Sequence, residues 1–294
     1  MFEFSYEATI PVPSGCERLE AWVPVASTDP GVQSVDLLRW KASAGTATIT
    51  RDEVYGNRMI HVVTERPQEP LTISWRAKIL RSTDVGQGRG PVHARYVQST
   101  AFVPLEGRAK QMAIDLGITD AALTTEQRAR RIYDDVLAGM AYDKNHDGWG
   151  MGSFEHATKV CKGNCTDFHS RFLGVGRAAG IPVRFTMGIP LGTAKTGSVN
   201  GYHCWAHYRD DGTWHPVDIS EADKVFATDP KKADWFFGHL DPDRVSISFG
   251  RDVQLEPPAK SGPRNFFVYP YAEADGREIP MDKSAWTFRW EELD

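Results

Sequence analysis

The sequence predicts a two-domain α+β protein, in which an antiparallel β-sandwich-type domain precedes a domain of helices followed by an antiparallel sheet. Apolar and polar side chains alternate through the first part of the chain, as in strands with one buried face. Helical periodicity begins only after about residue 105, and alternation returns after about residue 182. Runs of strands separated from runs of helices are typical of α+β architecture rather than of a parallel α/β sheet.

Composition excludes several classes of protein. The chain has 294 residues, of which 41% are hydrophobic and 25% charged, close to an ordinary globular protein with room for two domains. The net charge of −5 argues against a nucleic-acid-binding surface, which needs a basic footprint. No apolar run approaches the ~18 residues that cross a bilayer.

The N-terminus favours the cytoplasm slightly. Residues 1–5 have neither the positive charge nor the apolar run of a signal peptide. A chain that begins after a removed signal would instead be periplasmic or secreted.

Six strands are expected in the first domain. The alternation is strongest at residues 2–12 and 71–79, with shorter runs at 20–25, 34–40, 46–50 and 58–64. We assign residues 1–82 to this domain and residues 83–94, which contain three closely spaced glycines, to a linker. A long hairpin loop is the alternative for the linker.

The second domain is expected to cover residues 95–220. Helices are predicted at 106–116, 127–140 and 165–179, followed by strands at 183–189, 202–208 and 214–219. Thr124 and Gln127 form a capping-box pattern before the second helix, and Gly180 stands at the C-cap of the third. Residues 221–294 form an aromatic-rich extension that we expect to pack on this core.

One cysteine is placed for nucleophilic chemistry. The cysteines stand at 16, 161, 165 and 204, too few for a disulfide scaffold of this size. A turn-forming stretch delivers Cys165 to the first turn of a helix, where free amides and the helix dipole lower the pKa of a thiol. The thiolate is a nucleophile, and the same amides can stabilise an oxyanion. An inert buried cysteine is the alternative.

A histidine and an aspartate can meet across the predicted hairpin. If residues 209–212 form a four-residue loop, His203 lies directly opposite Asp218, with Cβ atoms about 4.5–5.5 Å apart. A loop of odd length would place the two side chains on opposite faces. The carboxylate can fix the imidazole tautomer, as the third member of a catalytic triad does.

Four segments occur in a characteristic order: Gly163-Asn164-Cys165-Thr166-Asp167, Gly180-Ile181-Pro182-Val183-Arg184, His203-Cys204-Trp205 and Trp214-His215-Pro216-Val217-Asp218. In this combination, residues 95–220 resemble the bacterial transglutaminase-like family of the papain-like cysteine hydrolase superfamily. The resemblance implies a papain-like α+β core and a triad of Cys165 as nucleophile, His203 as general base and acid, and Asp218 as orienting carboxylate. It implies no cofactor and no metal.

This chemistry leaves two reactions open. A thioester on Cys165 is resolved by water in a peptidase or amidase and by an amine in a transglutaminase. We favour a cysteine-dependent hydrolase of peptide or protein amides, because water is abundant and no amine-recognising acidic pocket is visible. The candidates for oxyanion or substrate contacts are Trp149, Asn164, Trp205 and His207. Family members often carry an acidic residue where His207 stands, so a second imidazole is expected to border the site.

Three binding hypotheses are alternatives to catalysis: a zinc site, a calcium loop and a non-catalytic module. Cys161, Cys165, His203 and His207 have spacings that resemble zinc ligands. However, two histidines four residues apart on a strand lie about 13 Å from each other, too far to share one ion. Residues 143–148 resemble the start of a calcium loop, but position twelve is Phe154 rather than the required glutamate. A non-catalytic binding module on an enzyme scaffold is the other alternative.

Overall fold

The computed structural model describes residues 1–86 and 93–293, and the chain divides into two compact units. The first contains Met1–Ser82, Met187–Tyr202 and Asp243–Asp294, and the second contains Thr83–Thr186 and His203–Pro242. Of the predicted linker, residues 87–92 lie outside the described residues. The domain boundaries expected at residues 82, 94 and 220 stay a prediction. Each of the two compact units is made of separate stretches of the chain.

The first unit contains two five-stranded antiparallel sheets. One has the order β10-β16-β1-β6-β3 and the other β15-β14-β2-β5-β4. The strands of the first sheet are β1 (Phe2–Ile10), β3 (Gln33–Ala42), β6 (Leu71–Arg81), β10 (Thr196–Val199) and β16 (Trp286–Glu292). Those of the second are β2 (Arg18–Val25), β4 (Thr46–Arg51), β5 (Arg58–Glu65), β14 (Tyr271–Ala274) and β15 (Arg277–Glu278). The unit also holds β13 (Arg244–Phe249) and the 3₁₀ turn η2 (Lys283–Ala285). All six predicted strands are present because alternate apolar residues, such as Phe4 and Tyr6, are fully buried.

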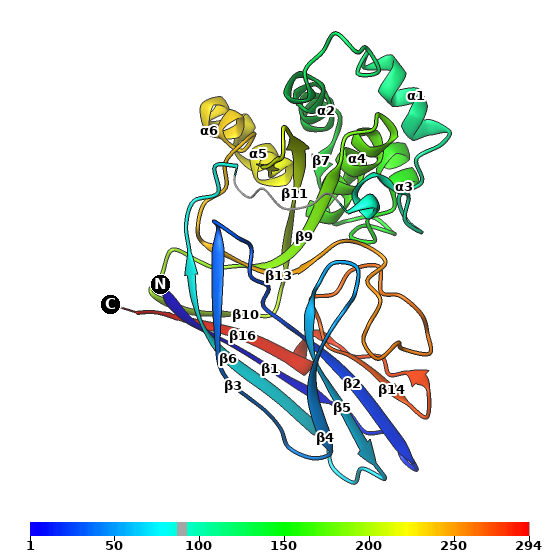
Figure 1. Cartoon of the computed structure of the whole chain (residues 1–294), viewed down its shortest axis with the longest axis vertical. Helices are drawn as coiled ribbons and strands as arrows, with labels where there is room; N and C mark the ends of the chain where they lie inside the picture. The colour runs from blue at the N-terminus through cyan, green and yellow to red at the C-terminus, as the bar shows by residue number, and fades with distance from the viewer. Residues whose placement is uncertain (87–92, 294) are drawn as a thin grey trace. The chain divides into compact units, whose positions relative to one another are not determined.

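The C-terminal extension is divided between the two units, whereas all of it was expected to pack on the helical core. Residues 221–242 belong to the second unit. Residues 243–294 belong to the first unit, where β16 pairs along β1 from Ala8↔Trp286 to Phe2↔Glu292. Figure 1 shows these two ends of the chain side by side. β14 pairs with β2 in the same manner. Without these strands β1 and β2 would each expose an unpaired edge, so the extension satisfies their backbone groups and buries Trp286 and Phe288.

The second unit is organised around one buried helix, α4 (Cys165–Ala178). It packs against η1, α1, α2, α3 and α5 and against β11, so every residue from Cys165 to Arg177 is buried. The neighbouring helices are η1 (Ala94–Val97), α1 (Arg108–Asp115), α2 (Thr125–Gly139), α3 (Phe154–Val160), α5 (Ile219–Phe226) and α6 (Pro230–Trp235). Its strands are β7 (Ala141–Tyr142), β8 (Lys162–Gly163), β11 (His203–Asp210) and β12 (Thr213–Val217). β9 (Val183–Pro190) begins in this unit and ends in the first, because the division falls between Thr186 and Met187. Within the described residues, no helix is both long and apolar enough to cross a membrane.

The predicted hairpin loop is wrong in length. Asp210 pairs with Thr213, so only Asp211 and Gly212 form the turn, with φ of +39° and +79°. Positive φ at both positions is the requirement of a type I′ turn, for which Asp-Gly is a favoured sequence. The register therefore shifts by two residues from the expected one. Because both loop lengths are even, the side chains keep their faces.

The start of α4 is held by its own polar residues. Asn164 caps the helix by accepting the Thr166 N–H at 2.9 Å, and the Asp167 carboxylate accepts the Asn164 N–H at 2.9 Å. The same carboxylate accepts the N–H groups of Gly150 at 2.7 Å and Gly152 at 3.0 Å. The predicted onset at Cys165 is confirmed, and these bonds fix the loop before α3 to the first turn of α4.

This arrangement predicts that Gly163→Ala damages the start of α4. An added Cβ would collide with the Asp167 side chain, whereas a Cβ at Gly180, the left-handed residue at the other end of α4, meets nothing within 4 Å. We expect Gly163→Ala to cost about 3 kcal/mol through overpacking and a damaged cap. Gly180→Ala should cost about 1 kcal/mol through backbone strain alone. Thermal melts compare the two variants.

The rate of Cys165 alkylation by iodoacetamide separates a local effect from a general one. It should fall in Gly163→Ala and be unchanged in folded Gly180→Ala. Equal melting temperatures and equal rates in the two variants would contradict this account of the helix start.

Candidate active site

The structure brings Cys165, His203 and Asp218 together. Cys165 is the first residue of α4, His203 is the first of β11, and Asp218 follows β12. His203 donates from Nε2 to Asp218 Oδ2 at 2.7 Å, and its side chain is also hydrogen-bonded to Cys165. All three residues are buried. Since Nε2 faces the carboxylate, the opposite ring nitrogen of His203 is the one available to a thiol.

Asp218 is positioned by a helix rather than by the strand that was expected to carry it. It is the N-cap of α5, and its Oδ1 accepts the Glu221 N–H and the Ser220 hydroxyl, both at 3.1 Å. The other oxygen is left for His203. A single carboxylate thus caps a helix and orients an imidazole. Aspartate three residues before glutamate is a sequence pattern of a helix start that could have revealed this role.

The charges of the site favour a thiolate–imidazolium pair. Burial alone would lower the pKa of His203, but the charge and hydrogen bond of Asp218 and the contact with Cys165 raise it to about 10. Burial alone would raise the pKa of Cys165, but hydrogen bonds from Cys204 and His203 and the charge of His203 hold it well below its usual value. The two shifts have opposite directions, so each group stabilises the charged form of the other.

His169 connects the two helix starts. Its Nδ1 donates to the Cys165 carbonyl at 2.7 Å, and its Nε2 accepts the Ile219 N–H at 3.2 Å. A ring that donates at one nitrogen and accepts at the other is neutral, and burial lowers the pKa of His169 in the same sense. His169 therefore contacts Cys165 through the backbone carbonyl of that residue.

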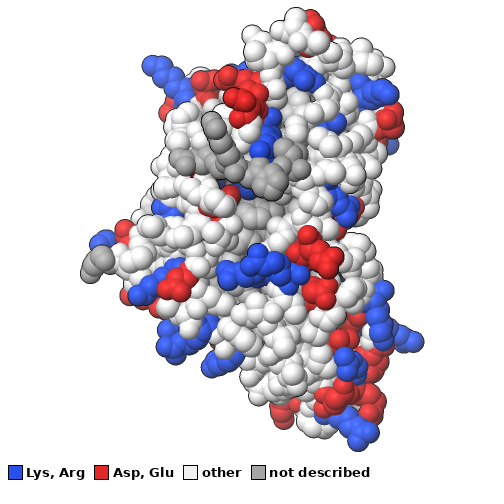
Figure 2. Space-filling view, in the orientation of Figure 1, with Lys and Arg blue, Asp and Glu red and all other residues white. Residues whose placement is uncertain are grey.

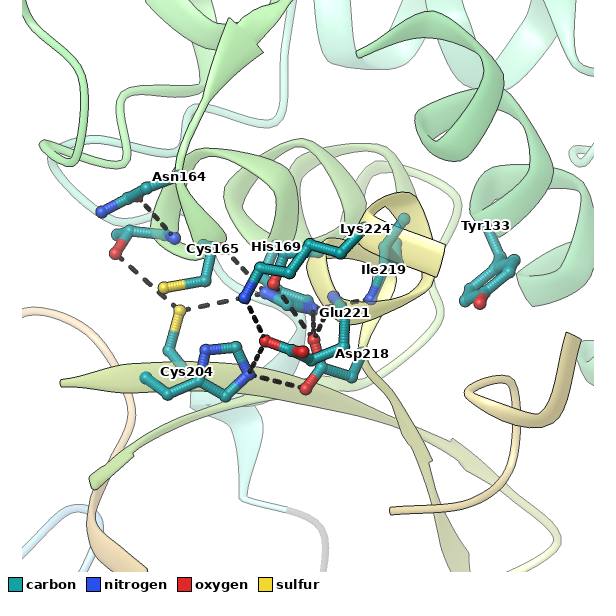
Figure 3. Close-up of polar contacts among 12 residues, drawn as sticks. Tyr133, Asn164, Cys165, His169, Cys204, Asp218, Ile219, Glu221 and Lys224 are labelled. Carbon is teal, nitrogen blue, oxygen red and sulfur yellow. Dashed lines mark hydrogen bonds and ion pairs between the residues drawn. The ribbon is translucent and has the colours of Figure 1, made fainter. Parts of the chain in front are cut away.

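Cys204 is the residue of the site that sequence reasoning missed. Its sulfur lies 3.8 Å from Thr166 Oγ1 and 3.9 Å from His169 Nδ1. Figure 3 shows its sulfur facing that of Cys165, and the two side chains are hydrogen-bonded. Burial, followed by the neighbouring Cys165 sulfur, raises the pKa of Cys204 well above its usual value. Its place directly after His203 was the available signal.

The amides at the start of α4 are less free than expected. Asn164 accepts the N–H groups of Thr166, Asp167 and Phe168 through its side-chain and backbone oxygens. Of the first four amides of the helix, only that of Cys165 is not bound by Asn164. The amide beside the sulfur is therefore the donor that an oxyanion on a bound substrate would meet first.

The remaining contact candidates lie in different surroundings. Trp149 is 37% exposed, and its ring lies 5.7 Å from Lys144 Nζ. Trp205 is buried with its ring centroid 6.1 Å from that of His203. Asn164 is occupied as the helix cap. Trp205 therefore lies beside the imidazole of His203, whereas Trp149 stands on an exposed loop.

His207 was expected to border the site, but the structure places it beside Asp84 instead. Its Nε2 lies 2.8 Å from Asp84 Oδ2, and Arg184 approaches its ring at 3.4 Å. Burial would raise the pKa of Asp84, but the hydrogen bond and charge of His207 outweigh it and lower that pKa. Four residues along an extended strand separate His207 from His203 by about 13 Å, which explains the separate cluster.

Residues of the two hypothetical metal sites make other contacts in the structure. Asp143 accepts the Asn145 N–H at 2.7 Å and pairs with Lys162 at 3.2 Å. Cys161 is exposed at the C-cap of α3. Among residues 1–86 and 93–293, no cluster of three or more His, Cys, Asp or Glu side chains could hold a metal ion.

Comparison with known proteins identifies this part of the chain. Residues 112–219, which include Cys165, His203 and Asp218, match the model of the transglutaminase-like superfamily. An uncharacterized protein of Haemophilus influenzae is 27% identical, over 94% of this chain and 86% of its own length.

One solved structure covers both units. The crystal structure of a "Putative Cysteine Protease" from Cytophaga hutchinsonii matches 99% of this chain and 97% of its own, with a TM-score of 0.60 and 13% identity. At that identity the likeness concerns the fold. The predicted resemblance and the α+β fold class are confirmed, since residues 112–219 match the model of the transglutaminase-like superfamily.

Proposed function

We propose that the protein is a cysteine-dependent hydrolase of peptide or protein amides, with Cys165, His203 and Asp218 as its catalytic triad. The observation that carries the proposal is the 2.7 Å hydrogen bond between His203 and Asp218 in contact with a buried thiol at a helix start. A peptide fits the surface charge better than a polyanion does. The net charge is −5, and Figure 2 shows basic side chains dispersed among acidic ones.

The mechanism uses the charge pair. The Cys165 thiolate attacks the amide carbonyl, and the Cys165 N–H donates to the oxyanion that forms. The His203 imidazolium gives its proton to the leaving amine, and a thioester remains on Cys165. His203, now neutral, removes a proton from water, which attacks the thioester and releases the acid. Asp218 stabilises the imidazolium at both stages.

Amine transfer is the second candidate, and Glu221 is the observation that favours it. One of its carboxylate oxygens lies 3.8 Å from His203 Nε2, where an approaching ammonium group could be held. Lys224 already forms an ion pair with the same oxygen. This pairing compensates the negative charge, so hydrolysis stays the preferred reaction.

A peptide library tests the reaction. Wild-type protein should release hydrolysed products, and Cys165→Ala should reduce the rate at least about 10³-fold, as loss of a catalytic nucleophile does. The exposed Cys161→Ala is the matched control and should keep its activity. Product masses with and without methylamine distinguish hydrolysis from transfer. A wild-type protein that yields neither product would favour the non-catalytic binding module.

The thiolate can be followed without a substrate. In a Cys161→Ser background, we expect Cys165 to react with iodoacetamide at a rate that holds as the pH is lowered from neutral and falls only when the pH passes below the lowered pKa of the thiol. The lowered pKa keeps the thiolate present above it, and the imidazolium persists until the pH passes about 10. Intact mass spectrometry measures the rate.

His203→Ala is the comparison for this profile. In this variant, the midpoint of the pH profile of Cys165 alkylation should move up toward the ordinary thiol pKa of about 8.5, because the positive charge of His203 is gone. A wild-type midpoint already near that value would argue against the charge pair.

Asp218→Asn separates the two roles of this carboxylate. Asparagine caps helices as well as aspartate does, so Asp218→Asn should keep the start of α5 and lose only the charge that stabilises the imidazolium, while activity falls about 10⁴-fold. Asp218→Ala loses the cap as well and should melt lower, by the equivalent of about 1 kcal/mol. Full activity in a folded Asp218→Asn protein would remove Asp218 from the triad.

A further inference from the structure

We propose that Cys204 is a resolving thiol: after a peroxide oxidises Cys165 to its sulfenic acid, Cys204 condenses with it to form a reversible disulfide within the core. The proposal rests on the Cys165 thiolate of the proposed function. It assigns a modification site to a buried cysteine that forms no bond to the substrate in the hydrolytic mechanism.

Geometry places the two thiols within reach of each other. Cys204 lies on β11, and its sulfur approaches the first turn of α4 through Thr166 Oγ1 at 3.8 Å and His169 Nδ1 at 3.9 Å. β11 packs against α4, and the two sulfurs face each other in Figure 3. Both side chains are buried, at 2% and 0% exposure for Cys165 and Cys204. The two side chains are also hydrogen-bonded to each other.

The other cysteines of the chain are less suited to this role. Cys161 is near in sequence, but its thiol donates to the Thr158 carbonyl at 3.4 Å at the end of α3. Cys16 belongs to the other compact unit. Cys204 is therefore the partner that the local structure supplies, and the exposed Cys161 serves as a matched control.

The chemistry balances with a peroxide as the only oxidant. The Cys165 thiolate attacks one oxygen of hydrogen peroxide, the O–O bond breaks, and the leaving hydroxide takes a proton from the neighbouring His203 imidazolium to become water. The Cys204 sulfur then attacks the sulfenic sulfur. An S–S bond forms, the S–O bond breaks, and the departing hydroxide combines with the Cys204 proton as a second water.

The disulfide would block the nucleophile and protect it at the same time. A sulfenic acid without a partner thiol oxidises further to sulfinic and sulfonic acids, which dithiols do not reduce. A disulfide is reduced by thiol exchange. Cys204 thus converts an irreversible loss of Cys165 into a reversible one.

Peroxide titration of the full chain tests the proposal. Wild type, Cys161→Ser and Cys204→Ser are treated with hydrogen peroxide, and intact masses and non-reducing peptide maps are recorded. Wild type and Cys161→Ser should lose about 2 Da, with the Cys165 and Cys204 peptides linked, and dithiothreitol should restore alkylation of Cys165. Cys204→Ser should gain oxygen at Cys165 and should not recover. Thermal melts establish that each variant is folded.

Each of the other outcomes disproves either the resolving role of Cys204, the proposed hydrolysis, or the thiolate on which both depend. Wild type that accumulates sulfinic acid as fast as Cys204→Ser, with no linked peptides, disproves the resolving role even if the peptide library is cleaved. Linked peptides from a protein that cleaves no peptide disprove the proposed hydrolysis and leave the disulfide site standing. A Cys165 that reacts with neither peroxide nor iodoacetamide overturns both, because the thiolate is their common premise.

Discussion

The hydrogen bond between His203 and Asp218 is the interaction on which the site depends. Asp218 can make it only because α5 begins at that residue and places its first turn around one carboxylate oxygen. His169 then joins the start of α5 to the start of α4, since it bonds both the Ile219 N–H and the Cys165 carbonyl. The sulfur and the carboxylate are therefore held by one continuous set of hydrogen bonds.

Because the site is buried, its charged groups must compensate one another. An isolated charge in the interior of a protein is costly, and a buried pair is tolerated only when the geometry is good and the remaining polar atoms are bonded. Here Cys165, His203 and Asp218 are buried together in the second unit, and the pKa shifts of Cys165 and His203 favour charged forms that compensate each other. The same constraint explains why His169 is neutral: it contributes position without adding another charge.

The sequence predicts an element correctly where its hydrophobic pattern extends over many residues. The fifteen-residue α2 and the alternating β1 and β6 were found at their places. The short helices α3, α5 and α6, of six to eight residues, were missed because they span too few turns to display a period. The hairpin register was also missed, because Asp211 and Gly212 suit a two-residue turn as well as they suit part of a longer loop.

The sequence by itself determined that a cysteine opens a buried helix and that a histidine and an aspartate share one face of a hairpin. Both facts follow from local chemistry: a helix cap, a C-cap glycine and the two-residue repeat of a strand. Tertiary structure alone decided that His207 turns to Asp84, that Cys204 meets Cys165, and that the last strand completes the first sheet. These contacts join residues far apart in the chain, and packing rather than local pattern selects among such partners.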